Sequence, residues 1–201
     1  MKLYYSSASP FARKVLMTAA EVGVLDRIEV VATTVMPTAP NTTVAALNPL
    51  MQVPTLELDD GSSLYDSKVI CEYLDWEFNG HVFPREGARR WNALRTNALA
   101  DGIMNAALLI RYEVTARPEA LRWSAWIDGQ RRKIAQGLDQ FDIDPPAGGD
   151  ALDIGGIAVA CALGYLGFRF ADDHWLDGRP QLKAWLDAVA QRESFVRTMP
   201  R

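Results

Sequence analysis

The stretch KLYYSSASPFARKVLM, residues 2–17, joins a short apolar run to a polar turn and then to a helical pattern. Ser9 followed by Pro10 is a typical helix start, because a serine side chain can accept a hydrogen bond from the first turn and proline has no N–H to leave unpaired. From Phe11 onward, apolar residues recur at helical spacing as far as Gly23, a residue type that commonly ends a helix in the left-handed conformation. The stretch therefore predicts a strand that leads directly into a helix.

The residues that follow continue an α/β pattern. A β-branched run, RIEVVA, comes soon after the helix, and a strand–helix–strand unit of this kind implies parallel strands. Farther along, Asp60 and Gly61 separate two short strand-like runs, which is a hairpin signal and predicts antiparallel pairing. The expected elements are a strand over 27–32, a loop over 33–43, strands over 55–58 and 63–65, and a helix over 67–78.

The chain changes character after NGHVFPREG, residues 79–87, which concentrates turn residues and a proline. Beyond it, alanine, leucine and arginine recur at helical spacing and no strand pattern is evident. Asp150 and Asp153 precede an apolar helical run with the spacing of a helix cap, so we expect them to start that helix. The predicted organisation is an α/β domain over 1–78, a linker over 79–87 and an all-helical domain over 88–201.

Composition argues against several classes of protein. Of the 201 residues, 49% are hydrophobic, and the 21 basic residues are scattered among 25 acidic ones, so nucleic acid is not an expected partner. Because no run of about 18 apolar residues is unbroken, we predict neither export nor a membrane span. Cys71 and Cys161 lie far apart in apolar patterns, so we expect buried, reduced thiols in a cytoplasmic protein. Two histidines offer little material for a metal site.

Several segments, in chain order, are similar to segments of the cytosolic glutathione transferases. YYSSASPFARKVLMTAAEVGV, residues 4–24, resembles the first strand and helix of the serine-type and omega-type members. NPLMQVPTL, residues 48–56, and DDGSSLYDSKVICEYL, residues 59–74, resemble the family's proline segment and the start of its third helix. GGDALDIGGIAVACAL, residues 148–163, resembles the buried helix of its second domain. The resemblance implies a thioredoxin-like N-terminal domain followed by an all-α C-terminal domain.

The resemblance places Ser9 at the position of the serine or cysteine that interacts with the sulfur of glutathione. A hydroxyl at a helix N-terminus can donate a hydrogen bond to a thiolate, and the helix dipole favours the negative charge. Tyr5 is the main competitor, because other classes of the family use a tyrosine at the end of the first strand. Ser6 and Ser7 are also near enough in sequence to substitute for Ser9. A purely structural role for Ser9, as a helix cap, is also open.

The resemblance implies two further sets of contacts with glutathione. In the family the proline of the second segment is cis, which would leave the backbone of Val53, before Pro54, free to pair with the cysteinyl part of the tripeptide. Asp66 and Ser67 would hold the γ-glutamyl group, although either could simply cap the helix. The same resemblance adds Phe11 and Gln52 to the glutathione contacts. At Met51 and Gln52, many members carry a lysine or a histidine that holds the glycyl carboxylate.

The function implied by the resemblance is transfer of the glutathione thiolate to a small, hydrophobic electrophile by a cytoplasmic homodimer, with a role in detoxification. Glutathione would be a co-substrate, and neither a permanently bound cofactor nor a metal is expected. A non-catalytic binding protein with the same fold is one alternative. A glutathione-dependent reductase or peroxidase is another, although a reductase that works through a mixed disulfide needs a cysteine where this chain has Ser9.

Overall fold

The structure is a computed structural model that describes residues 1–200. It contains two compact units, one formed by residues 1–90 with the segment that begins at Arg192, and the other by residues 91–191. The sequence prediction assigned the segment from Arg192 onward to the helical domain. The observed grouping differs because this segment is tied to the first unit, where Arg192 forms an ion pair with Glu21 at 2.7 Å.

The first unit is built on a four-stranded sheet with the strand order β2-β1-β3-β4. β1 pairs with β2 in parallel, whereas the β1–β3 and β3–β4 pairs are antiparallel. The predicted strand–helix–strand unit and the predicted hairpin are therefore confirmed. The second strand begins two residues later than predicted, because a 3-10 turn occupies Leu25–Arg27. The strands are β1 (Lys2–Tyr5), β2 (Glu29–Ala32), β3 (Thr55–Glu57) and β4 (Ser63–Leu64).

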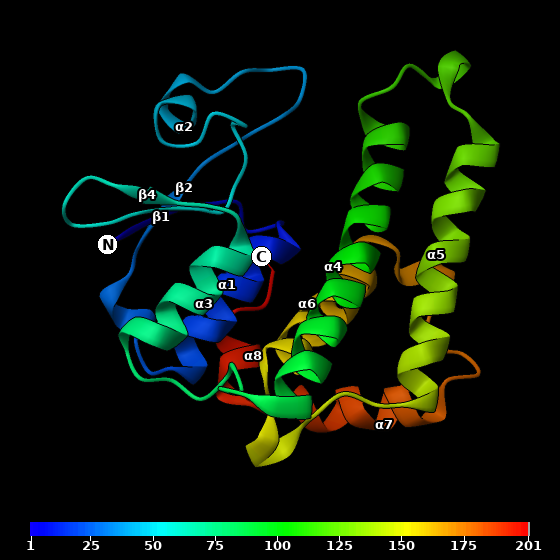
Figure 1. Ribbon diagram of the computed structural model, residues 1–201. Coiled ribbons are helices and arrows are strands. Elements are labelled where there is room, and N and C mark those ends of the chain that lie inside the picture. The colour runs from blue at the N-terminus through cyan, green and yellow to red at the C-terminus, as the bar shows by residue number, and fades with distance from the viewer. Residues whose placement is uncertain (201) are drawn as a thin grey trace. The chain divides into compact units, whose positions relative to one another are not determined.

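Two helices, α1 (Pro10–Glu21) and α3 (Ser67–Glu77), lie side by side on one face of this sheet (Figure 1). Leu3 and Leu56 from the sheet and Ile70 from α3 are completely buried. Burial of each such side chain stabilises the fold by about 1.5–3 kcal/mol, so helix–sheet packing holds the two helix starts in place. A short helix near the C-terminus, α8 (Glu193–Arg197), completes the unit.

The helix α2 (Thr42–Leu47) was not predicted, and its first residues overlap the expected loop over 33–43. It begins at Asn41, whose side chain accepts a hydrogen bond from the N–H of Val44 at 3.1 Å. Six residues are too few to show a helical period, and three of them are β-branched, which weakens the helical signal further. The sequence pattern therefore could not show this helix.

The second unit is helical, and within residues 91–191 the structure contains no strand. A thioredoxin-like domain followed by an all-helical one, the predicted fold class, is therefore confirmed. No helix within residues 1–200 is both long and apolar enough to cross a membrane. The helices are α4 (Gly87–Thr115), α5 (Ser124–Ile143), α6 (Ile154–Arg169) and α7 (Pro180–Val189), with 3-10 turns at Glu119–Leu121, Gly149–Ala151 and Ala171–Asp173.

The buried helix α6 starts at Asp153, whose Oδ1 accepts a hydrogen bond from the N–H of Gly156 at 3.1 Å. The prediction that Asp150 also starts this helix is wrong, because Asp150 lies in the 3-10 turn before the helix and is exposed. Close packing explains Gly155, since a Cβ there would lie 2.7 Å from the side chain of Thr96 on α4.

Candidate functional site

Three segments of the first unit reach the same end of the sheet. β1 and β3 are antiparallel with Tyr4 opposite Thr55, so the turn after β1 lies beside the residues that precede β3. β3 and β4 are antiparallel with Leu56 opposite Leu64, so the residues after β4 reach that end as well. The register therefore brings together the turn before α1, the proline loop before β3 and the start of α3.

Ser9 is the N-cap of α1 and is half-buried. Its Oγ accepts a hydrogen bond from the N–H of Ala12 at 3.2 Å, and its own N–H donates to the carbonyl of Ser6 at 2.9 Å. A serine hydroxyl has one proton and two acceptor lone pairs, so a cap that occupies one lone pair leaves the proton available. Ser9 can therefore cap the helix and donate a hydrogen bond to a ligand at the same time.

Two cations are buried within the first half of α1, since Arg13 is 4% exposed and Lys14 is completely buried. Arg13 donates to the carbonyl of Phe195 at 3.1 Å, and its guanidinium lies 4.2 Å from the centre of the Phe195 ring. The first turn of α1 carries no acidic residue, so the helix dipole favours an anion near the helix start. The helical pattern could not show this burial, because charged side chains are usually exposed.

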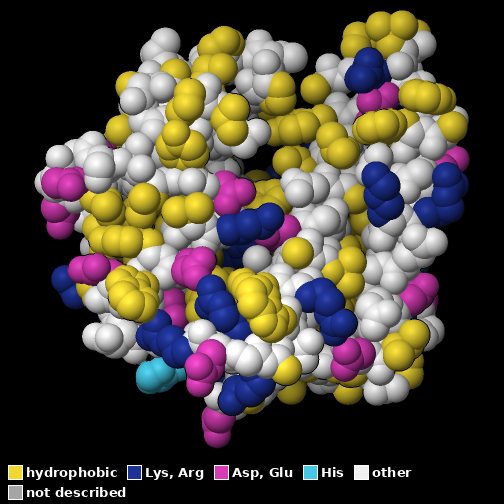
Figure 2. Space-filling model, viewed as in Figure 1, with side chains coloured by type: hydrophobic (Ala, Val, Ile, Leu, Met, Phe, Trp, Pro, Cys, Tyr) yellow, Lys and Arg dark blue, Asp and Glu magenta, His cyan; other side chains and the backbone are white. Residues whose placement is uncertain are grey.

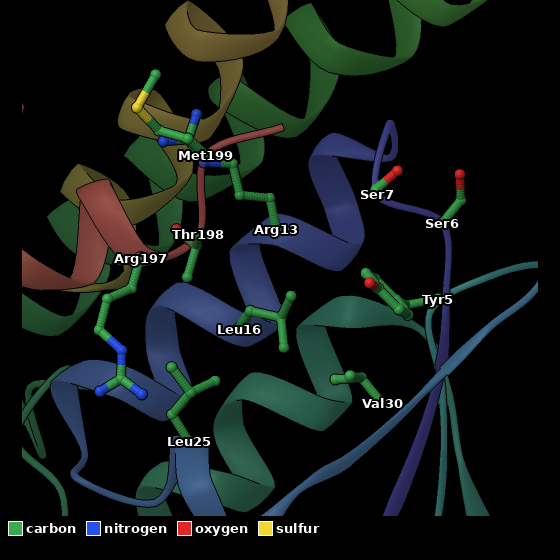
Figure 3. Close-up of a pocket in the computed structure, with 10 residues that line it drawn as sticks. All are labelled: Tyr5, Ser6, Ser7, Arg13, Leu16, Leu25, Val30, Arg197, Thr198 and Met199. Carbon is green, nitrogen blue, oxygen red and sulfur yellow. The ribbon is translucent and has the colours of Figure 1, made fainter. Parts of the chain in front are cut away.

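Tyr5, the alternative to Ser9, has a different environment. It ends β1, is half-buried, and lines a groove together with Ser6 and Ser7 (Figure 3). Ser9 is not among the residues that line this groove. Phe11, in the first turn of α1, is half-buried. The two candidate hydroxyls therefore lie at the two ends of the turn between β1 and α1 and have different neighbours.

The Val53-Pro54 bond is cis, as predicted. Within residues 1–200, the backbone N–H and C=O of Val53 form no hydrogen bond. The preceding carbonyl, that of Gln52, accepts from the side chains of Asn48 at 3.1 Å and Thr55 at 2.8 Å, which fixes the loop in front of β3. The side chain of Gln52 is exposed. This loop therefore presents one free donor and one free acceptor, as an extended peptide requires.

Asp66 is the N-cap of α3, and its Oδ1 accepts a hydrogen bond from the N–H of Lys68 at 2.9 Å. Asp66 is exposed, whereas Ser67 is 2% exposed. As in the first turn of any helix, the N–H groups of Ser67 and Val69 have no acceptor within the helix. The start of α3 can therefore bind a carboxylate through these donors while Asp66 attracts a cation.

These features match the chemistry of a short peptide with a free amino-acid end. The loop of Val53 supplies backbone pairing, the start of α3 supplies a carboxylate and ammonium site, and Ser9 supplies a hydroxyl. Within residues 1–200, no cluster of three or more histidine, cysteine or acidic side chains could hold a metal ion. Cys71 and Cys161 are buried, as predicted, and neither forms a disulfide.

Comparison with known proteins identifies the family. Residues 8–76 match the glutathione S-transferase N-terminal domain, and residues 124–188 match the glutathione S-transferase C-terminal domain. The chain is also 35% identical over 204 residues to an uncharacterized GST-like protein of Escherichia coli K12, YibF, covering 100% of this chain and 98% of that protein. The chain belongs to the glutathione S-transferase family. The resemblance inferred from the sequence is therefore confirmed.

Solved structures of other glutathione transferases agree with this chain over its full length. A family member from Pseudomonas fluorescens Pf-5 with bound glutathione is 42% identical, with a TM-score of 0.93, and the match covers 100% of this chain and 98% of that chain. A glutathione S-transferase from Methylobacillus flagellatus KT with bound glutathione is 39% identical, with a TM-score of 0.87 and coverage of 100% and 99%. Both relatives therefore bind glutathione on the fold that this chain adopts.

Proposed function

We propose that this glutathione S-transferase family member binds glutathione in its first unit and transfers the thiolate to a small, hydrophobic electrophile. The observation that carries the proposal is the gathering of three features at one end of the sheet: the hydroxyl of Ser9, the unpaired backbone of Val53 and the open helix start at Asp66 and Ser67. The glutathione-bound relatives support the choice of peptide.

Each end of the tripeptide has a matching group in the proposed complex. The backbone of Val53 pairs with the cysteinyl residue, with Pro54 behind it and Phe11 and Gln52 at the edges. The N–H groups at the start of α3 and the hydroxyl of Ser67 hold the γ-glutamyl carboxylate, and Asp66 accepts from the ammonium group. This arrangement places the cysteinyl sulfur near the start of α1.

The start of α1 then stabilises the thiolate. A helix dipole contributes about 0.3–1 kcal/mol, or up to about 2 kcal/mol where it is sheltered, which lowers a thiol pKa by roughly one unit. The hydroxyl of Ser9 adds a hydrogen bond to the sulfur. Tyr5 could donate such a bond only from the neighbouring groove. Because the nucleophile belongs to the substrate, placement and a lowered thiol pKa suffice, and the protein needs no strong general base of its own.

We also propose a homodimer in the cytoplasm, with no permanently bound cofactor and a role in detoxification. The exposed face of α3 supports the dimer, because Val69 is 47% exposed and Trp76 is 72% exposed, and Tyr65 just before the helix is 37% exposed. Figure 2 shows hydrophobic side chains gathered over this helix. An apolar surface of this kind is typical of an interface. Trp76→Asp should shift the mass measured by light scattering from dimer to monomer, while the control Val196→Asp on α8 should not.

Titration calorimetry with glutathione, together with an assay of an electrophile, tests the proposed activity. Glutathione should bind in the micromolar to millimolar range usual for enzyme substrates, and turnover should depend on Ser9. The departures at Met51 and Gln52 favour one alternative, a protein that binds glutathione without catalysis. Binding without any turnover across a panel of electrophiles would support that alternative, and absence of binding would contradict both.

A further inference from the structure

The peptide group between Gln52 and Val53 carries a donor that the proposed glutathione site uses. Its N–H belongs to Val53 and forms no hydrogen bond within residues 1–200, whereas its carbonyl belongs to Gln52 and accepts two. This peptide bond is trans, so the group is planar and its N–H and C=O point in opposite directions. Whatever holds the carbonyl therefore also sets the direction of the N–H.

Two side chains hold the Gln52 carbonyl, and we call Asn48 and Thr55 the carbonyl clamp. The Nδ2 of Asn48 donates to the Gln52 oxygen at 3.1 Å, and the Oγ1 of Thr55 donates to it at 2.8 Å. Asn48 Nδ2 also donates to Thr55 Oγ1 at 3.1 Å, which closes a triangle of hydrogen bonds. Both lone pairs of the carbonyl are occupied, so the peptide group cannot turn without loss of both bonds to its oxygen.

The two residues of the carbonyl clamp are themselves fixed. Thr55 is completely buried in β3, opposite Tyr4, and Asn48 is 2% exposed. The N–H of Asn48 donates to the carbonyl of Val44 at 2.7 Å, and its Oδ1 accepts from the N–H of Leu50 at 3.0 Å. The carbonyl clamp therefore joins the end of α2 to the start of β3 through side chains that are shielded from water.

The carbonyl clamp improves the Val53 N–H as a donor in two ways. Connected hydrogen bonds polarise one another, so a carbonyl that accepts two bonds makes the N–H of the same peptide group a stronger donor. An N–H that already points in one direction also loses less conformational freedom when a ligand binds. Both effects favour a bound peptide carbonyl, and neither requires Asn48 or Thr55 to touch the ligand.

We infer that Asn48 and Thr55 are positioning residues for glutathione, which act through the Gln52 carbonyl on the N–H of Val53. The inference rests on the proposed function, because it takes the cysteinyl residue of glutathione as the partner of Val53. Loss of the carbonyl clamp should weaken the contact with Val53 and leave the contacts at the start of α3 unchanged.

The same substitution at two completely buried threonines tests the inference on the full chain. Thr55→Val removes one donor to the Gln52 carbonyl, whereas the control Thr18→Val removes a hydroxyl that donates to Cys71 Sγ at 3.4 Å. Thr55→Val should raise both the dissociation constant and the KM for glutathione about tenfold and leave kcat within about twofold, because the clamp contributes equally to ground-state and transition-state binding. Thr18→Val should change none of these constants by more than about twofold. Thr55→Ser keeps the hydroxyl and should bind glutathione as the wild type does.

Binding of L-glutamate separates positioning from a general distortion of the site, because this ligand reaches only the start of α3 in the proposed complex. Its dissociation constant, measured by NMR titration, should be the same in wild type and Thr55→Val. Equal losses for glutamate and glutathione would overturn the inference. An unchanged glutathione constant in Thr55→Val, with the circular dichroism of the wild type, would also overturn it.

The free wild-type protein provides a test that needs neither a folded variant nor glutathione. Relaxation of ¹⁵N should give the Val53 N–H an order parameter of about 0.85, as in rigid backbone, and the value should fall in Asn48→Ala. A wild-type value below about 0.6 would overturn the carbonyl clamp. Absence of glutathione binding by a wild-type protein with a rigid Val53 N–H would contradict the proposed function and its extension to Asn48 and Thr55, but not the clamp itself.

Discussion

The helix that begins at Asp66 and the helix that begins at Asp153 start with the same interaction. Asp66 accepts from the N–H of Lys68 at 2.9 Å, and Asp153 accepts from the N–H of Gly156 at 3.1 Å. Their surroundings differ, because Asp66 is exposed whereas Asp153 is half-buried. A Cβ at Gly156 would lie 2.5 Å from the carbonyl of Ala147, so the chain itself covers the start of α6.

The difference shows that a cap motif does not reveal its role. At both helices the carboxylate satisfies an N–H that would otherwise lack an acceptor. At α6 the neighbouring chain leaves no room for a ligand, and at α3 the end of the sheet brings the helix start to the surface beside two other candidate binding groups. What surrounds the helix end separates a structural cap from a candidate binding site.

The largest expected effect belongs to a third helix start, at Ser9. Ser9→Ala and Ser9→Gly should each lower kcat about a hundredfold with a glutathione dissociation constant within twofold of wild type, because both remove the donor to the sulfur. Glycine is a tolerated cap and should cost only a few tenths of a kcal/mol of stability, whereas alanine should cost about 1 kcal/mol. Steady-state kinetics and urea unfolding separate the two effects. Full turnover in Ser9→Gly would reduce Ser9 to a cap and move the donor role to Tyr5.

The same substitution at the starts of α3 and α6 tests whether the two caps differ in role. Asp66→Asn and Asp153→Asn each keep a good cap, since asparagine and aspartate are comparable at this position. Asp66→Asn should raise the glutathione dissociation constant about tenfold, because the charge that faces the γ-glutamyl ammonium is lost. Asp153→Asn should leave it unchanged. Equal constants for wild type and Asp66→Asn, measured by calorimetry, would mean that α3 starts with a structural cap only.

Removal of the cap from α6 should affect stability alone. Asp153→Ala should lower the free energy of unfolding by about 0.5–2 kcal/mol, whereas Asp150→Ala, in the preceding turn, should change it by less than about 0.5 kcal/mol. Urea denaturation measures both, and glutathione affinity is the control. A larger loss from Asp150→Ala than from Asp153→Ala would contradict the cap seen in the structure.

A smaller effect is expected at the other end of α1, where a carboxylate is held by side chains from outside the helix. Burial alone would raise the pKa of Glu21, but hydrogen bonds from Arg192 and Ser194 and the charge of Arg192 bring it below its usual value. Ionised Glu21 therefore stabilises the folded state above its unfolded pKa, and this contribution is lost as the pH falls through the lower folded pKa.

Glu21→Gln should therefore cost about 1 kcal/mol near neutral pH, and the difference from wild type should shrink toward zero below about pH 4. Thermal unfolding of both proteins between pH 3 and pH 8 measures it. A difference that persists unchanged at pH 3 would assign the effect of the substitution to packing rather than to charge.

The sequence predicted a helix, strand or turn correctly wherever the pattern that indicates it lies within one short segment. The pair Ser9-Pro10, the periodicity up to Gly23 and the hairpin at Asp60-Gly61 predicted elements that the structure contains. Each depends on backbone geometry within a few residues, which the sequence encodes directly. The six-residue helix α2 was missed because its length is below the range in which periodicity can be recognised.

The sequence by itself determined that an α/β half is followed by a helical half, and which residue types stand at the helix starts, because these follow from local backbone preference and hydrophobic spacing. Its resemblance to the glutathione transferases implied the thioredoxin-like fold. Only the tertiary structure decided which helix start is open and which is covered, that Asp153 rather than Asp150 caps α6, and that Arg13 and Lys14 are buried. It also decided that the segment from Arg192 packs on α1. These outcomes depend on contacts between residues far apart in the chain, and no local pattern contains them.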